Sequence, residues 1–98
     1  MKAMSRAEVE AIVRELLRKY HAEYALLFGS YARGEAGADS DIDIVVFGGK
    51  QFRPADIFSF GEELRERTHK AVDAFEIREL NAGTPFYQAV MQEGVRIA

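Results

Sequence analysis

The sequence contains no cysteine and no tryptophan, and only two of its 98 residues are proline. The lack of cysteine excludes a disulfide framework and metal sites built on thiolates. No apolar run approaches the roughly 18 residues of a membrane-spanning helix, and the first residues lack the apolar core of a signal peptide. We therefore expect a cytoplasmic protein that does not bind membranes.

Positive charge is not in excess either, because 13 lysines and arginines face 16 aspartates and glutamates, for a net charge of -3. Without a basic field, direct binding to nucleic acid is not expected. The apolar share of 48% and the charged share of 30% are ordinary for a globular protein. This length predicts a single domain, residues 1–98, with one modest core and a shallow cleft.

Local patterns predict helices and strands in alternation. Ser5 and Glu8 form a capping box ahead of an apolar stripe with helical spacing, and Thr84 followed by Pro85 is a typical helix start. Helices are expected over residues 6–20, as one turn after Ser30, over residues 54–67 and over residues 85–93. Strands are expected over residues 24–28, 42–47 and 71–77, with residues 95–97 as an optional edge strand. The order α-β-α-β-α-β-α predicts an α/β (α+β) fold with a small mixed three-stranded sheet flanked by helices.

Two aspartates stand at the beginning of the second predicted strand. Side chains alternate along a strand, so Asp41 and Asp43 point the same way. Neighbouring carboxylates repel each other and resist full ionisation, and folding alone gives no reason for such a pair. Magnesium takes oxygen ligands and is often held by one or two carboxylates together with substrate phosphates. The pair therefore predicts a metal site.

Gly29 and Ser30 end the first predicted strand. Glycine permits close approach of the backbone to a ligand. The hydroxyl of Ser30 and the free amides of a following turn can bind a phosphate, although Ser30 could also simply cap that turn. Arg33 could pair either with a phosphate or with Glu35. A phosphate-binding turn next to a metal site predicts a nucleoside triphosphate site.

A third carboxylate would complete a two-metal arrangement, in which the ions lie ~3.5–4 Å apart. Asp73 and Glu76 both fall in the third predicted strand. They are three positions apart and face opposite sides, so only one can serve. We choose Asp73, which would bind metal and draw the proton from an attacking hydroxyl.

The spacing of these residues is also that of a known signature. Gly29-Ser30, ten further residues and then Asp41-Ile42-Asp43 resemble the motif of the DNA polymerase beta-like nucleotidyltransferases. The longer string from Gly29 to Val46 resembles the minimal nucleotidyltransferase (MNT) branch. Residues 71–73 resemble the strand that carries the third carboxylate of this family, and residues 93–97 resemble its usual ending. One departure is Ala74-Phe75, where family members often have Leu-Val.

The resemblance implies ATP and Mg²⁺, with two ions expected, and Asp41, Asp43 and Asp73 as ligands. It also implies a biological role, because such proteins are commonly encoded with a HEPN-domain RNase toxin. They resemble antitoxins that transfer AMP from ATP to a tyrosine of that toxin.

Two other functions stay open. The chain could be a non-catalytic antitoxin that neutralises a HEPN toxin by occlusion. It could also modify a small molecule such as an aminoglycoside, which would need a further domain or a pocket shared in a dimer. The acceptor, the base, the number of nucleotides transferred and the homo- or hetero-oligomeric state are not determined by the sequence.

Overall fold

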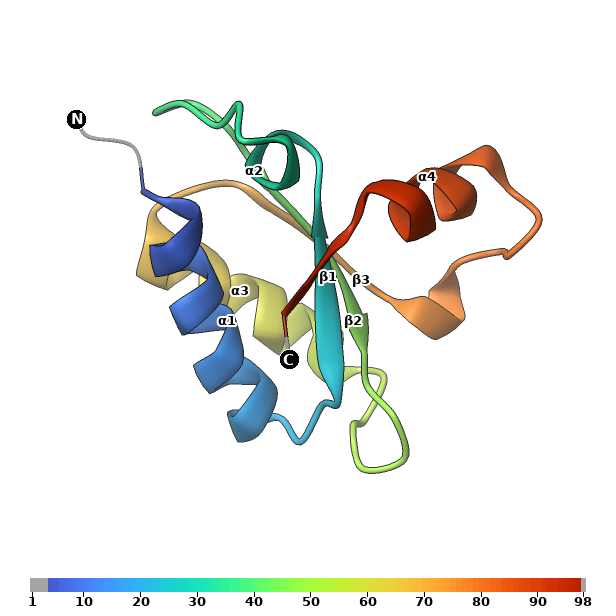
Figure 1. Cartoon of the computed structure of the whole chain (residues 1–98). Coiled ribbons are helices and arrows are strands. Elements are labelled where there is room, and N and C mark those ends of the chain that lie inside the picture. Colours follow the sequence, from blue (N-terminus) through green and yellow to red (C-terminus); the bar gives the residue numbers. More distant parts are fainter. Residues whose placement is uncertain (1–3, 98) are drawn as a thin grey trace.

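The computed structural model describes residues 4–97, in which helices cover both faces of a sheet (Figure 1). The elements in chain order are α1 (Arg6–Lys19), β1 (Tyr24–Phe28), α2 (Ser30–Arg33), β2 (Ile42–Phe47), α3 (Asp56–Thr68), β3 (Val72–Glu76), η1 (Ile77–Glu79), α4 (Pro85–Glu93) and β4 (Val95–Ile97). The predicted α/β class and the alternation of elements are confirmed.

The sheet is mixed, as predicted, with the strand order β3-β2-β1-β4. β2 and β3 are parallel, whereas β1 is antiparallel to both β2 and β4. The prediction of three strands is wrong by one, because β4 pairs with β1 through Leu27 and Val95. This three-residue strand covers an edge of β1 that would otherwise expose unpaired backbone groups. A strand this short has too little periodicity to be assigned firmly from sequence.

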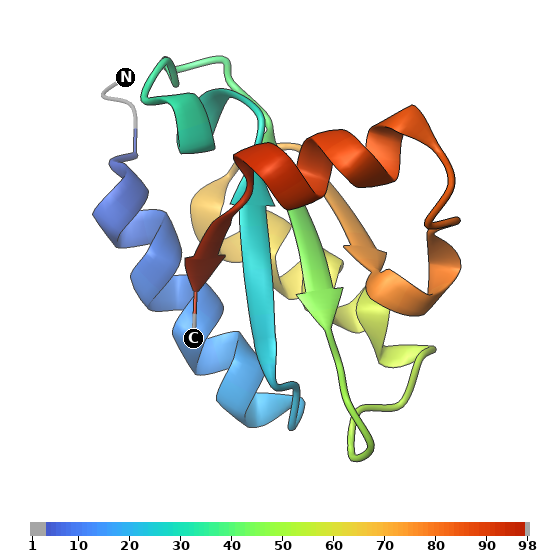
Figure 2. The same ribbon diagram turned by 45° about the vertical axis from the view of Figure 1, so that its right-hand side comes forward.

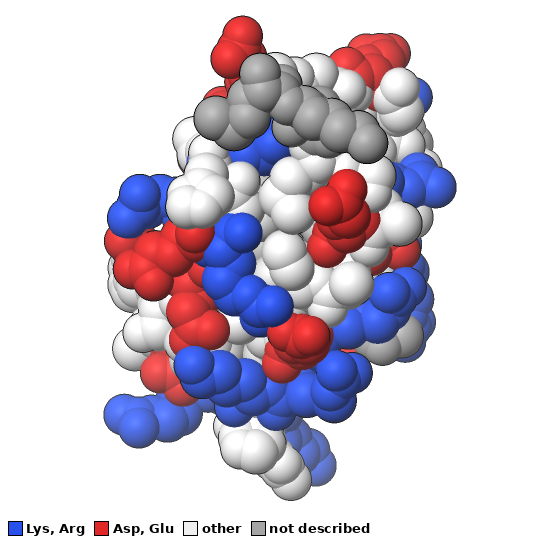
Figure 3. Space-filling model, turned by 90° about the vertical axis from the view of Figure 1, so that its left-hand side faces the viewer, with Lys and Arg blue, Asp and Glu red and all other residues white. Residues whose placement is uncertain are grey.

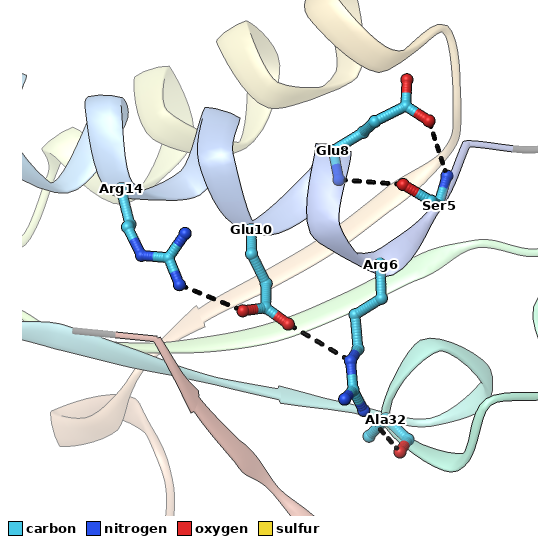
Figure 4. Close-up of polar contacts among 6 residues, drawn as sticks. All are labelled: Ser5, Arg6, Glu8, Glu10, Arg14 and Ala32. Atoms are coloured by element: carbon cyan, nitrogen blue, oxygen red, sulfur yellow. Dashed lines mark hydrogen bonds and ion pairs between the residues drawn. The ribbon is translucent and has the colours of Figure 1, made fainter.

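The predicted helix caps are present. The amide of Glu8 donates to Ser5 Oγ, and the amide of Ser5 donates to Glu8 Oε1, each at 3.1 Å (Figure 4). At α4 the hydroxyl of Thr84 accepts from the amide of Tyr87 at 3.2 Å. These side chains satisfy amides that have no partner inside the helix, and so they determine where α1 and α4 begin.

The main core lies between the sheet and the helices α1 and α3. Its largest members are fully buried, and burying each such side chain contributes about 1.5–3 kcal/mol. They include Leu16, Leu27, Ile42, Ile44, Phe60, Leu64 and Ile97. Because side chains alternate along β2, the residues between Ile42, Ile44 and Val46 point to the other face of the sheet. That second face carries Asp43.

α4 crosses this second face (Figure 2). Phe86 of α4 packs edge-on against Phe28 of β1 and Phe75 of β3, with ring centres 5.5 and 5.6 Å apart. Val45 and Val90 are buried on the same side. The second face therefore carries a thin apolar layer. The acidic residues at the start of β2 and β3 lie next to this layer.

The opposite side of the molecule, formed largely by α1 and α3, has a surface on which charges of both signs are interspersed (Figure 3). Arg14 pairs with Glu10 at 3.2 Å, and Arg67 pairs with Glu15 at 2.7 Å. Exposed pairs of this kind contribute little to stability. Across residues 4–97, no helix combines the length and the apolar character needed to cross a membrane.

Candidate functional site

The chain turns sharply at Gly29, directly beside Asp43. Antiparallel pairing places Phe28, the last residue of β1, opposite Asp43. Gly29 follows with φ 71° and ψ -147°, a conformation close to a region that only glycine normally adopts. A β-carbon at position 29 would stand 2.5 Å from Asp43 Oδ2. The backbone conformation therefore favours glycine here, and any larger residue would also displace the carboxylate of Asp43.

The single turn of α2 follows at once, as predicted. The amide of Arg33 donates to the carbonyl of Gly29 at 3.1 Å, and the turn ends at Gly34, which has φ 73°. Gly29 occupies the N-cap position, where no side-chain hydrogen bond is made. Ser30 is thus the first helical residue and not the cap, so its hydroxyl is not needed for that role.

The three predicted aspartates gather at one end of the sheet. Asp43 is opposite Asp73 in the parallel register of β2 and β3. Burial raises the pKa of Asp43, and the negative charges of Asp73 and Asp41 raise it further. The positive charge of Arg33 opposes this shift in the pKa. Asp41, Asp73 and Arg33 therefore each lie near enough to Asp43 to act on its carboxylate electrostatically.

Glu76, the other acidic residue considered in β3, uses its carboxylate in hydrogen bonds to Arg78. Its side chain is 1% exposed. Its Oε1 accepts from Arg78 Nε at 2.6 Å, and its Oε2 accepts from the amide of Arg78 at 2.5 Å. These bonds start the short helix η1. Asp73, by contrast, is exposed, so the structure separates the two acids as their spacing predicts.

Arg33 makes one of its two predicted contacts. Its Nε lies 3.1 Å from Glu35 Oε2, and about half of the Arg33 side chain is exposed. Such an exposed pair is weak and can be exchanged for a stronger partner. Arg33 therefore stands near Asp43 with a guanidinium that a phosphate could recruit.

The side chains do not form a finished metal site. Among residues 4–97, no three His, Asp or Glu side chains are close enough together to hold a metal ion. The donor types nevertheless fit magnesium, because the acids at this sheet end are all oxygen donors and Gly29 leaves space beside Asp43 Oδ2. Two bound ions stay a prediction.

A contact that the sequence did not predict ties α2 to α1 (Figure 4). Arg6 Nη1 donates to the carbonyl of Ala32 at 3.4 Å, while Arg6 Nε lies 3.2 Å from Glu10 Oε2. Glu10 in turn pairs with Arg14. The capped end of α1 is therefore joined to the turn that begins with Ser30.

Comparison with known families agrees with this geometry. The family model described as polymerase beta, nucleotidyltransferase matches residues 10–98. The chain therefore belongs to this nucleotidyltransferase family, and the resemblance of the Gly29–Asp43 motif is confirmed.

Two individual proteins illustrate this similarity. A Methanocaldococcus jannaschii protein named "Putative protein adenylyltransferase MJ0435" is 38% identical over 66 residues, which cover 67% of this chain and 71% of that protein. One chain in a crystal structure of a toxin-antitoxin with AMP-PNP has a TM-score of 0.77 and 25% identity, covering 91% of this chain and 72% of its own length.

A third similar protein has almost the same extent. A solved structure described as a "putative minimal nucleotidyltransferase" superposes with a TM-score of 0.74 and 27% identity, over 94% of this chain and 95% of that one. The four-stranded sheet flanked by helices is thus the architecture of a minimal nucleotidyltransferase.

Proposed function

We propose that this chain transfers AMP from ATP to a hydroxyl group of a partner protein, a tyrosine of a HEPN-domain toxin, and so acts as its antitoxin. The observation that carries the proposal is the placement of Asp43. This carboxylate lies opposite Asp73 in the sheet and directly against the turn at Gly29. A phosphate held at that turn would therefore meet the acidic residues.

Asp41 and Asp43, with Asp73 as the third carboxylate, would hold magnesium. The raised pKa of Asp43 shows that its negative charge is disfavoured by burial and by the other two aspartates. A divalent cation relieves this penalty, because it replaces repulsion with attraction. When bound, magnesium neutralises triphosphate charge and lowers the pKa of a coordinated hydroxyl.

The turn between β1 and α2 would bind the triphosphate. Gly29 lets phosphate oxygens approach the backbone, and the Ser30 hydroxyl can donate a hydrogen bond to them. Arg33 would leave Glu35 and pair with a phosphate, which carries more charge than a carboxylate. These contacts would place the α-phosphorus beside the carboxylates.

The reaction is an in-line displacement. The acceptor oxygen forms a bond to the α-phosphorus, the bond from that phosphorus to the bridging oxygen breaks, and pyrophosphate leaves with that oxygen. Asp73 takes the proton from the acceptor hydroxyl as the new bond forms. Because the residues contribute position and charge and form no covalent intermediate, their spacing determines the rate.

The nature of the acceptor is supported by the relatives. The Methanocaldococcus relative is named as a protein adenylyltransferase, and one of the similar structures is a toxin-antitoxin with AMP-PNP. The shallow cleft expected for a chain of 98 residues also favours an acceptor that arrives on another protein. The HEPN class and the tyrosine come from the family resemblance of the motif.

The test is incubation with labelled ATP, Mg²⁺ and the cognate HEPN toxin. We expect label on the toxin with the unchanged chain and none with Asp41→Ala/Asp43→Ala. Asp39→Ala, which removes an exposed carboxylate from the neighbouring loop, is the matched control and should still label. Absence of label with the unchanged chain contradicts the proposal. Full neutralisation of the toxin by the double variant would instead favour occlusion without catalysis.

A further inference from the structure

Lys70, two residues before β3, is a nearly buried lysine. Lys70 is only 9% exposed. Within residues 4–97, none of the salt bridges involves it. A buried lysine is costly unless other groups satisfy its charge. The groups that contact the ammonium of Lys70 therefore indicate its role.

Three backbone carbonyls supply that satisfaction. Lys70 Nζ donates to the carbonyl oxygens of Gly37 at 3.2 Å, Ala38 at 2.9 Å and Ser40 at 3.1 Å. An ammonium has three N–H groups, so all three can be used. Lys70 Nζ also lies 5.7 Å from the ring centre of Tyr31, a distance at which a cation is attracted to an aromatic face.

The segment that Lys70 binds links the two halves of the proposed site. It runs from the end of α2, the helix that begins with Ser30, to Asp41, the residue before β2. Gly37 and Ser40 themselves form only a small turn, with the Gly37 amide 2.8 Å from Ser40 Oγ and the Ser40 amide 3.2 Å from the Gly37 carbonyl. Most of this loop is exposed. Lys70 is thus the buried anchor of an otherwise exposed connection.

We propose that Lys70 is a positioning residue for nucleotidyl transfer. Its ammonium joins residues 37–40 to the buried ring of Tyr31. This attachment sets the position of Asp41 relative to Ser30, and hence of the metal ligands relative to the phosphate-binding turn. Lys70 acts through the loop and does not touch the nucleotide. The inference rests on the proposed function for its effect on transfer, but not for its effect on the loop.

The effect on the loop is measured without nucleotide or partner. Lys70→Met keeps a long side chain and removes the ammonium, so amide hydrogen exchange at Gly37 and Ser40 should become about tenfold faster or more. Lys50→Met is the matched control, because Lys50 is exposed and follows the opposite end of β2. Unchanged exchange at both amides in Lys70→Met overturns the proposal.

The effect on the reaction is measured by transfer of labelled AMP. Displacement of reacting groups by about 1 Å can cost roughly a hundredfold in rate, so Lys70→Met should be about 10–100-fold slower, and Lys50→Met should not. Lys70→Ala leaves a space of the shape of propylammonium. Added propylammonium should restore transfer and slow exchange in Lys70→Ala in a saturable manner, without effect on Lys50→Ala.

This rescue separates positioning from a general loss of folding, and it applies even if Lys70→Met does not fold. Failure of propylammonium to restore either quantity in Lys70→Ala counts against the proposal. If the unchanged chain transfers no AMP, the proposed function fails. The role of Lys70 in holding the loop is then decided by the exchange rates alone.

Discussion

Asp43 Oδ2 occupies the space that the β-carbon of any residue other than glycine would need at position 29, since that carbon would lie only 2.5 Å away. The turn at Gly29 and the start of β2 are therefore fitted to each other at a single point. The fit arises because antiparallel pairing brings the end of β1 against the start of β2. It also explains why Gly29 and Asp43 belong to one motif although 13 residues separate them.

Gly29→Ala should therefore damage both stability and transfer, whereas Gly34→Ala should affect stability alone. Both glycines have positive φ, 71° and 73°, but only Gly34 is in the left-handed helical region, where alanine costs about 1–2 kcal/mol. Gly29 is close to a region that only glycine normally adopts, where strain costs about 1–3 kcal/mol. Only Gly29 adds a clash, because a β-carbon at Gly34 would meet nothing within 4 Å. Chemical denaturation and AMP transfer check the pair. Equal loss of transfer in both variants would contradict the role of the Gly29–Asp43 contact.

The parts of this fold that the sequence predicts well are those determined locally. The capping box of Ser5 and Glu8 and the alternation that puts Asp41 and Asp43 on one side need only neighbouring residues. The pairing of β4 depends on an edge of β1 that exists only after the sheet has formed. No sequence pattern indicates the role of Lys70, because a lysine before a strand is usually a solvated residue. Its three carbonyl partners lie 30 to 33 positions earlier in the chain.

Asp43→Asn should make the chain more stable while it abolishes transfer. Burial and the charges of Asp73 and Asp41 raise the pKa of Asp43, so its ionised form is disfavoured in the folded state. Removing that charge should raise the melting temperature at neutral pH without magnesium. Arg33 acts in the opposite direction and reduces this gain.

The pH dependence follows from the direction of this shift. Because the pKa of Asp43 is raised in the folded state, the penalty in the unchanged chain is present above that pKa and fades as the pH falls toward about 3.9, the ordinary value. The melting temperatures of Asp43→Asn and the unchanged chain should therefore converge in acid. Asp39→Asn, in the exposed loop, is the control and should show no gain. A gain of equal size at every pH would exclude the electrostatic explanation.

Asp73→Asn and Glu76→Gln should have opposite effects. Asp73 is exposed beside Asp43 and its charge raises the pKa of that residue, so Asp73→Asn should raise stability slightly and slow transfer by about 10²–10⁴, the contribution typical of a general base. Glu76 is buried with both oxygens bonded to Arg78, so Glu76→Gln should cost roughly 1–3 kcal/mol in the free energy of unfolding. Rates are compared per folded molecule. Loss of transfer in Glu76→Gln but not in Asp73→Asn would reverse the assignment of the third carboxylate.

Tyr20 should make the chain lose stability in alkali. Burial, and then its hydrogen bond of 2.8 Å to Glu63, raise the pKa of Tyr20 to about 12. The unfolded chain loses this proton near pH 10, so the stabilisation is complete below that pH and is lost as the pH rises toward 12. Denaturation of the unchanged chain and of Tyr20→Phe should therefore differ most below pH 10 and converge above it.

In Glu63→Gln, tyrosinate absorbance should show a lower pKa for Tyr20 that stays above 10, because burial, the larger cause, is unchanged. A pKa for Tyr20 that does not move in Glu63→Gln would show that this hydrogen bond between the end of α1 and α3 does not form in solution.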